Sequence, residues 1–122
     1  MADLFGSWGL PRFQPLAREA RSFPTRWARA VGRRVPSEVL ALYAPNAVLV
    51  PTFSRTILQG VPQLAAYFAE FLARPGLRCR IDNQIVQELS PEIQVISGDY
   101  SFSQLDPNRR GKRSIIKARF TF

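Results

Sequence analysis

The stretch IQVISGDYSFSQLDPNRRGKRSIIKARFTF, residues 93–122, contains two runs in which apolar and polar side chains alternate. Alternation with a period of two is typical of a β-strand that buries one of its faces. Between the runs, the segment DPNRRG places proline, asparagine and glycine at positions that favour a tight turn. The stretch therefore predicts two antiparallel strands joined by a hairpin loop.

The C-terminal run IIKARFTF, residues 115–122, predicts which side chains share a face but not which face is buried. One face would carry Ile116, Ala118, Phe120 and Phe122, and the other Ile115, Lys117, Arg119 and Thr121. An inward Arg119 needs an acidic partner or a bound anion, because an unpaired buried charge is costly. An outward Arg119 is a surface residue beside Lys117. The alternation alone leaves both directions open.

Three helices and three further strands are predicted before this hairpin. Residues 77–89 alternate and predict a third long strand, whereas AVLVPTF and RTILQG predict two short ones. Apolar residues at helical spacing predict a helix from about Phe23 to Gly32, with Ser22 as its N-cap. A second helix would start at Pro36, and a third, in VPQLAAYFAEFLARPG, would end at the Pro-Gly pair.

This order of elements predicts an α+β fold in which helices cover one face of an antiparallel sheet. Residues 1–22 are interpreted as an N-terminal arm and turn, and residues 23–122 as one domain. The arm carries apolar residues that would cover an exposed surface of the domain or a partner. They are Leu4, Phe5, Trp8, Leu10 and Phe13.

The 122 residues carry a formal net charge of +8, and this charge is unevenly distributed. Residues 1–35 and 105–122 each carry a net +5, whereas residues 36–104 carry a net −2. Such a field attracts acidic partners and polyanions. The sequence contains no recognisable nucleic-acid-binding motif. The interpretation therefore favours a solvated arginine-rich surface over a nucleic-acid partner.

Several kinds of chemistry are excluded by residue content. The chain contains no histidine, which excludes imidazole acid–base catalysis and histidine metal ligands, and its one cysteine, Cys79, cannot form an intrachain disulfide. The nine acidic residues are scattered, so no catalytic residue, metal site or cofactor is predicted. With no signal-peptide pattern and no apolar run of the ~20 residues that a membrane span needs, we expect a cytoplasmic protein without a membrane partner.

Four segments resemble the nuclear-transport-factor-2-like (cystatin-like) superfamily. They are LYAPNAVLVPTFS at 42–54, GVPQLAAYFAEFL at 60–72, SGDYSF at 97–102 and ARFTF at 118–122. Within that superfamily the chain is similar to the SnoaL-like group, and above all to the association domain of calcium/calmodulin-dependent protein kinase II and its bacterial stand-alone relatives. The resemblance implies a cone: a curved antiparallel sheet with helices on its concave face and a pocket inside. Such domains continue after Arg-Phe-Thr-Phe into a further strand, so the final strand is expected to be missing and the edge of residues 115–122 to be unpaired or covered.

The resemblance also implies a pocket, and the residues available to line it are mostly aromatic. In kinase association domains the matching strand carries an arginine that is directed into a cavity, and such cavities hold carboxylate-bearing ligands. For each aromatic residue, ordinary core packing is the competing interpretation. The predicted ligand-binding residues are Arg119, Tyr100, Trp27, Tyr43, Tyr67 and Phe102.

Two functional hypotheses from different classes follow. The first is a non-catalytic association module that forms a homodimer or a ring through the outer faces of its long strands, with a cavity for a small anionic or carboxylate ligand. The alternative is a cavity enzyme of the SnoaL or ketosteroid-isomerase type that acts on an apolar ring substrate. The alternative requires an acidic residue inside the cone.

Overall fold

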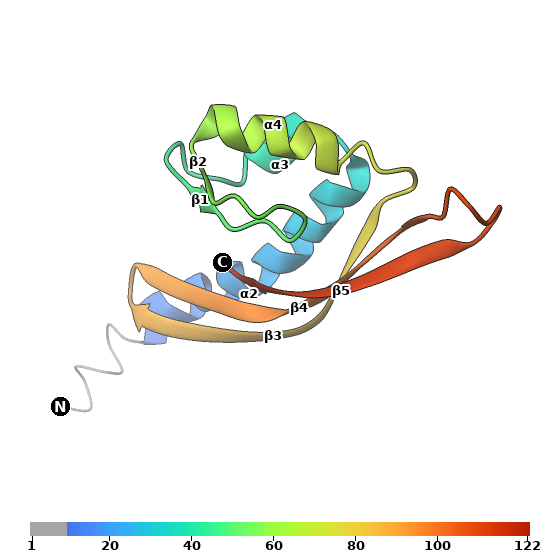
Figure 1. The fold of residues 1–122 in the computed structure, drawn as a ribbon. Helices are drawn as coiled ribbons and strands as arrows, with labels where there is room; N and C mark the ends of the chain where they lie inside the picture. The colour runs from blue at the N-terminus through green and yellow to red at the C-terminus, as the bar shows by residue number, and fades with distance from the viewer. Residues whose placement is uncertain (1–9) are drawn as a thin grey trace.

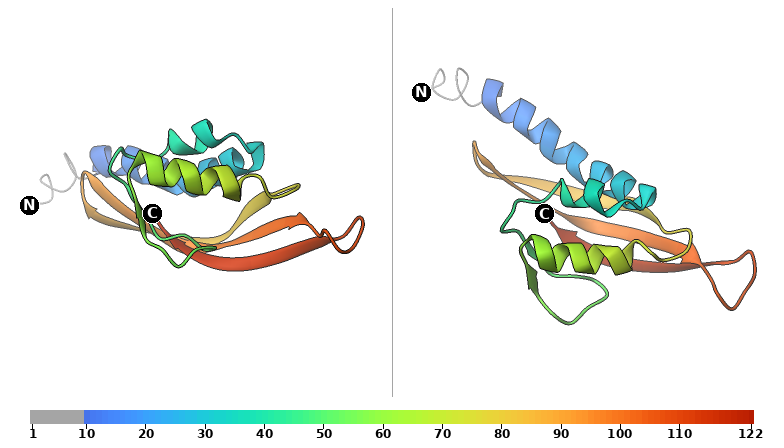
Figure 2. Two further views of the ribbon diagram at one scale, coloured as in Figure 1. Left: turned by 45° about the horizontal axis from the view of Figure 1, so that its top comes forward. Right: turned by 90° about the horizontal axis from the view of Figure 1, so that it is seen from above.

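The fold was obtained as a computed structural model, which describes residues 10–122 and the side chains from Glu19 onward. Its helices are α2 (Leu10–Arg33), α3 (Pro36–Leu40) and α4 (Val61–Phe71). Its strands are β1 (Val48–Leu49), β2 (Leu58–Gln59), β3 (Arg78–Ser90), β4 (Ile93–Leu105) and β5 (Arg113–Thr121). Figures 1 and 2 show all three helices over one face of a curved sheet. The predicted α+β fold is confirmed.

The main sheet is antiparallel and has the order β3-β4-β5. Its registry places Tyr100 opposite Ile81 and Ala118, so the hairpin predicted at residues 93–122 is confirmed. Within residues 10–122, β5 pairs only with β4, and β1 and β2 form a separate two-stranded sheet. Because the three long strands curve together beneath the helices, their concave face forms the floor of the core (Figure 2).

The first helix is longer than predicted. Residues 10–22 were interpreted as arm and turn, but they lie in α2, which runs without interruption through Pro24. Proline inside a helix removes a hydrogen bond and crowds the preceding turn. Pro24 is fully buried, so packing against the core offsets that cost. The predicted arm residues Leu4, Phe5 and Trp8 lie outside the described residues.

In the structure, one face of β5 is directed toward the helices and the other is exposed. Phe120 is buried and Ala118 is half-buried on the helix side, whereas Lys117, Arg119 and Thr121 are exposed on the other side. The aromatic residues on the helix side of β5 thus belong to the same core as Tyr100. Trp27 of α2 packs against Tyr100, and its ring centroid lies 5.6 Å from that of Phe122.

No helix within residues 10–122 combines the length and the apolar character that a membrane span requires.

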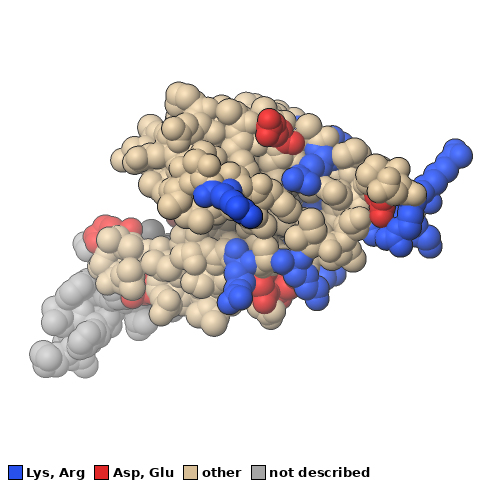
Figure 3. Space-filling view, viewed as in Figure 1, with Lys and Arg blue, Asp and Glu red and all other residues tan. Residues whose placement is uncertain are grey.

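The positive charge is concentrated on particular parts of the surface. In Figure 3, Lys and Arg atoms gather at the hairpin that joins β4 to β5, where Arg109, Arg110 and Lys112 are exposed.

Candidate functional site

Two cavities flank the aromatic core on the helix side of the sheet. The first, called the inner cavity, has a volume of about 630 Å³ and lies between α2, the segment after α3, β1 and the end of β5. Its lining consists of Phe23, Trp27, Leu42, Tyr43, Ala44, Val48, Leu49, Val50, Tyr100, Arg119, Phe120, Thr121 and Phe122.

The two tyrosine hydroxyl groups in the inner cavity are hydrogen-bonded to neighbouring side chains. Trp27 Nε1 donates a hydrogen bond of 2.8 Å to the Tyr43 hydroxyl, and the Tyr100 hydroxyl lies 3.2 Å from Thr52 Oγ1. Burial raises the pKa of Tyr43 and of Tyr100, and these hydrogen bonds oppose the shift only in part. Both phenols therefore stay neutral at physiological pH, and Arg119 is the one charged side chain among the described residues that line this cavity.

Within the described part of the chain, the inner cavity has no acidic side chain for proton transfer. None of the residues that line it is acidic. Asp99, the acidic residue nearest to Tyr100 in β4, is on the opposite face of that strand and accepts a hydrogen bond of 2.9 Å from Asn83 Nδ2. The requirement of the enzyme hypothesis, an acid inside the cone, is not met in this cavity.

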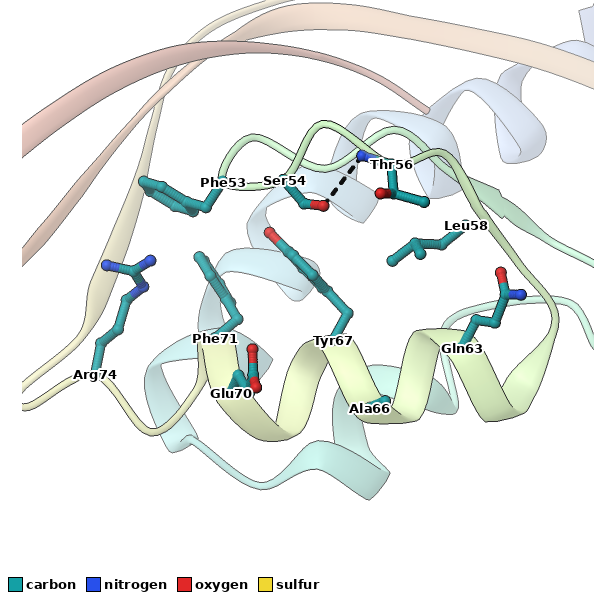
Figure 4. A pocket seen from close by; sticks show the side chains of 10 residues that line it. All are labelled: Phe53, Ser54, Thr56, Leu58, Gln63, Ala66, Tyr67, Glu70, Phe71 and Arg74. Atoms are coloured by element: carbon teal, nitrogen blue, oxygen red, sulfur yellow. Dashed lines mark hydrogen bonds between the residues drawn. The ribbon is translucent and has the colours of Figure 1, made fainter.

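The second cavity, called the α4 cavity, lies between α4 and the segment that joins β1 to β2, and is shown in Figure 4. Its volume is about 600 Å³, and it is partly open to solvent. Its lining consists of Phe53, Ser54, Thr56, Leu58, Gln63, Ala66, Tyr67, Glu70, Phe71 and Arg74.

Aromatic rings form the inner wall of the α4 cavity. Tyr67 and Phe71, one helical turn apart on α4, stack with an interplanar angle of 12° and a centroid distance of 5.6 Å. Phe53 packs against Phe71 from the opposite side of the cavity at 5.4 Å. Burial raises the pKa of Tyr67 to about 12, although the backbone amide of Phe53 opposes this shift. The Tyr67 phenol is therefore a neutral hydrogen-bonding group.

Arg74 lies just beyond the C-terminus of α4 and closes one end of the α4 cavity (Figure 4). Its guanidinium carbon lies 4.2 Å from the ring centroid of Phe53 and 5.9 Å from that of Phe71. Its Nη1 donates a hydrogen bond of 3.3 Å to Gln104 Oε1, whereas its Nε is buried without a partner. A cation of this kind beside aromatic rings is a binding element for anions.

Four of the six predicted ligand-binding residues, Trp27, Tyr67, Tyr100 and Phe102, line a small cavity of about 30 Å³, but the six do not share either of the two larger cavities. Trp27, Tyr43 and Tyr100 line the inner cavity, whereas Tyr67 lines the α4 cavity. Phe102 is only 3% exposed and packs between the two cavities, in contact with Trp27, Phe53 and Phe71.

Arg119 is exposed, lies on the opposite strand face from Phe120, and is among the residues that line the inner cavity. Of the two arginines that line these cavities, Arg74 has its guanidinium over aromatic rings. Sequence reasoning took the segment RPG at 74–76 only as the end of a helix and did not select Arg74 or Phe53. The helical spacing of Tyr67, Phe71 and Arg74 in the sequence was the available signal.

The outer face of the main sheet carries a third group of polar side chains. Ser101 donates a hydrogen bond of 2.5 Å to Asp82, which also accepts one of 2.7 Å from Arg80. These two bonds hold the pKa of Asp82 below its usual value. Asp99 and Arg119 are direct neighbours across β4 and β5, yet no ion pair joins them.

Comparison with solved structures identifies a neighbour of substantial sequence identity. It is a protein of Xanthomonas campestris described as a calcium/calmodulin dependent protein kinase II association domain, with 35% identity and a TM-score of 0.77. The match covers 87% of the present chain and 74% of that protein. No protein-family model matches the sequence, and no curated protein matches it.

Two other solved structures share the fold at low identity. One is SalBIII, described as an epoxide hydrolase/cyclase-like enzyme with a role in pyran ring formation in the polyether salinomycin. It has 15% identity and a TM-score of 0.70, and the match covers 87% of this chain and 80% of the enzyme. A protein of Novosphingobium aromaticivorans described as a scytalone dehydratase has 11% identity and a TM-score of 0.73, over 89% and 74%. These two support the fold alone. The Xanthomonas neighbour resembles the chain in sequence as well as in fold, at 35% identity over most of both chains. On this basis, the chain belongs to the calcium/calmodulin-dependent protein kinase II association-domain family of the nuclear-transport-factor-2-like superfamily.

Proposed function

We propose that the chain is a non-catalytic association module that pairs with a second copy of itself through the outer face of the β3-β4-β5 sheet. The observation that carries the proposal is the exposure of this face. All three helices lie on the opposite side, and no element within residues 10–122 covers it (Figures 1 and 2). The similarity to a protein described as an association domain supports the same proposal.

The side chains of the outer face suit a self-complementary contact. Ile85 is 68% exposed and Ile115 is 67% exposed, which offers apolar area to a partner. The same face carries both signs of charge, including Asp99 and the unpaired Arg119. A two-fold interface brings the same patch together twice, so a patch with acids and bases side by side can pair each with its opposite in the second copy.

Sedimentation equilibrium or light scattering over a range of protein concentrations tests this proposal. We expect the wild-type chain to dimerise or form a larger closed ring, and Ile115→Asp to shift it toward monomer. Ile57→Asp is the matched control, because Ile57 has the same 67% exposure but lies in the segment between β1 and β2. A wild-type protein that is monomeric at every concentration, or an equal effect of both substitutions, would contradict the proposal.

The enzyme hypothesis rests on the fold alone. The enzyme-like neighbours have 15% and 11% identity to the chain. Tyr67 and Glu70 both line the α4 cavity, but no hydrogen bond joins them. No particular arrangement of residues in either cavity favours proton-transfer chemistry.

A further inference from the structure

The α4 cavity contains a cation whose hydrogen-bonding capacity is only partly used. Among the described side chains, Arg74 makes no ion pair with a carboxylate within 4.0 Å. Its one side-chain hydrogen bond is the 3.3 Å contact from Nη1 to Gln104, and its Nε is buried without an acceptor. A buried donor without an acceptor is destabilising, and most such groups in folded proteins have a partner. Nη2 makes no hydrogen bond to a described residue and is not among the buried atoms, so it is the donor that an acceptor in the cavity can reach.

The surroundings of Arg74 define the kind of anion that fits. The guanidinium group is planar and is stacked on the ring of Phe53 at 4.2 Å, so its N–H donors are directed around its edge. A planar carboxylate matches that edge with two parallel hydrogen bonds. The stacked rings of Tyr67 and Phe71 continue the wall away from the charge, and they suit a flat apolar body attached to the carboxylate.

The size and the remaining polar groups of the cavity agree with such a ligand. A volume of about 600 Å³ lies within the usual range for small-molecule sites, roughly 300–1,000 Å³. The neutral Tyr67 phenol can donate to a second ligand oxygen. The Gln63 side-chain oxygen already accepts a hydrogen bond of 2.8 Å from the backbone amide of Gln59, which leaves its amide protons for a ligand.

We infer that the α4 cavity is a binding site for a small aromatic carboxylate, held by Arg74 at the carboxylate and by Phe53, Tyr67 and Phe71 at the ring. This site is separate from the inner cavity, which Arg119 helps to line. The inference does not rest on self-association, because the cavity lies on the helix side of the sheet and the proposed interface lies on the other side (Figure 1).

Glu70 controls the affinity of this site. It lies in the last turn of α4 and lines the same cavity as Arg74, which follows the helix. In this structure the two side chains do not pair, so Glu70 is left as a negative charge at the cavity. That charge opposes an anionic ligand, and removing it should strengthen binding.

The test is a titration of the protein with phenylacetate, followed by amide chemical shifts and by calorimetry. We expect saturable binding, with the largest shifts in α4 and in residues 53–58. Phenylacetamide, a neutral molecule of the same shape, should bind at least about tenfold more weakly, because it lacks the charge that strengthens the hydrogen bonds to Arg74.

Three pairs of variants locate the site. Arg74→Gln should weaken phenylacetate binding about tenfold or more, whereas Arg110→Gln, which removes the same charge from the β4–β5 hairpin, should leave it unchanged. Ala66→Trp should block the cavity, whereas Ala69→Trp, at an exposed site of α4 outside the cavity, should not. Glu70→Gln should tighten binding about two- to fivefold, with Glu92→Gln on the β3–β4 turn as its control.

Unfolding midpoints of the variants separate loss of binding from loss of structure. Ala66→Trp changes an exposed residue, so it tests the site even if Arg74→Gln weakens the fold. The inference is wrong if phenylacetate does not saturate, if phenylacetamide binds as tightly, or if a folded Arg74→Gln protein binds normally. Shifts confined to the inner cavity around Trp27 and Tyr43 would also overturn it.

Discussion

At the scale of single residues, Gly98 occupies a position in β4 where no side chain fits. A Cβ atom there would lie 2.1 Å from the backbone oxygen of Asn83 and 2.7 Å from the ring of Phe120. Real Cβ contacts of that length do not occur, and the Asn83 oxygen belongs to a strand paired with β4. The missing side chain lets the Phe120 ring approach β4 closely, with its centroid 5.0 Å from that of Tyr100.

We therefore predict that Gly98→Ala destabilises the protein by about 3 kcal/mol, because both Phe120 and β3 must shift to accommodate one methyl group. Gly32→Ala is the matched control. Gly32 is in α2 with no atom within 4 Å of its added Cβ, so alanine should stabilise the helix by about 0.5–1 kcal/mol. Urea unfolding of both variants measures these changes. Equal midpoints for the two would show that the contact at Gly98 is relaxed at little cost.

The same scale shows what the sequence could predict of the candidate site. Alternation in IIKARFTF correctly grouped Phe120 with Ala118 and Arg119 with Lys117. It could not decide which group was buried, because alternation shows which residues share a face but not which face is toward the core. Arg74 was missed for a different reason: its position depends on Phe53, which is distant in sequence and reaches α4 only when the β1–β2 segment folds over it.

At the scale of elements, Arg34 connects the helices. It follows α2 and has a φ angle of 61°, a left-handed conformation that is unfavourable for residues other than glycine. Its Nε donates a hydrogen bond of 2.9 Å to the Leu72 carbonyl oxygen, and its Nη2 one of 3.3 Å to that of Ala73. These carbonyls lie at the C-terminal end of α4, where helix oxygens lack partners within the helix. Arg34 therefore has an unfavourable backbone conformation, and its side chain provides hydrogen-bond donors to two carbonyl oxygens at the end of α4.

Two substitutions separate these effects. Arg34→Ala should destabilise the protein by about 1–3 kcal/mol, because it keeps the left-handed backbone and loses both hydrogen bonds. Arg34→Gly loses the same bonds but relieves the backbone, so it should be about 1 kcal/mol more stable than Arg34→Ala. Chemical unfolding of the two variants gives the difference directly. If alanine and glycine are equally destabilising, the backbone of residue 34 is not strained in solution.

The elements themselves were more predictable than their ends. The three long strands and the helix at Pro36 follow from local patterns and turn residues, and the structure contains them. The predicted start of α2, near Phe23, was wrong because the rule that proline ends a helix applies to an isolated helix. In the folded chain, Pro24 is buried with Trp27 and Val31, and that packing maintains a helix that local propensity would end.

At the scale of the whole molecule, the sheet separates two surfaces. The α4 cavity and the inner cavity lie on the helix side, and the proposed interface lies on the uncovered side (Figure 2). The overall fold and family could be recognised from sequence because the matching segments are packing and turn motifs. The position of the binding groups could not, because it depends on how the segment between β1 and β2 lies over α4.

This separation leads to a prediction about coupling. Two sites influence each other only if a ligand binds the two states of the protein with different affinity. Ile115 is on the outer face of β5, whereas Arg74 contacts the helix-side residue Gln104, so assembly need not alter the cavity. We expect Ile115→Asp to bind phenylacetate within about twofold of the wild-type affinity, well below the roughly fivefold change that typical allosteric coupling produces.

Thermodynamic linkage gives the converse measurement. If affinity is independent of assembly, saturating phenylacetate must leave the dissociation constant of the wild-type assembly unchanged, because coupling between two binding equilibria is reciprocal. Sedimentation equilibrium with and without ligand measures that constant, and phenylacetamide controls for solvent effects. A shift in assembly caused by phenylacetate but not by the amide would mean that the sheet transmits the state of the cavity, and Gln104, which joins Arg74 to β4, would then be the first residue to substitute.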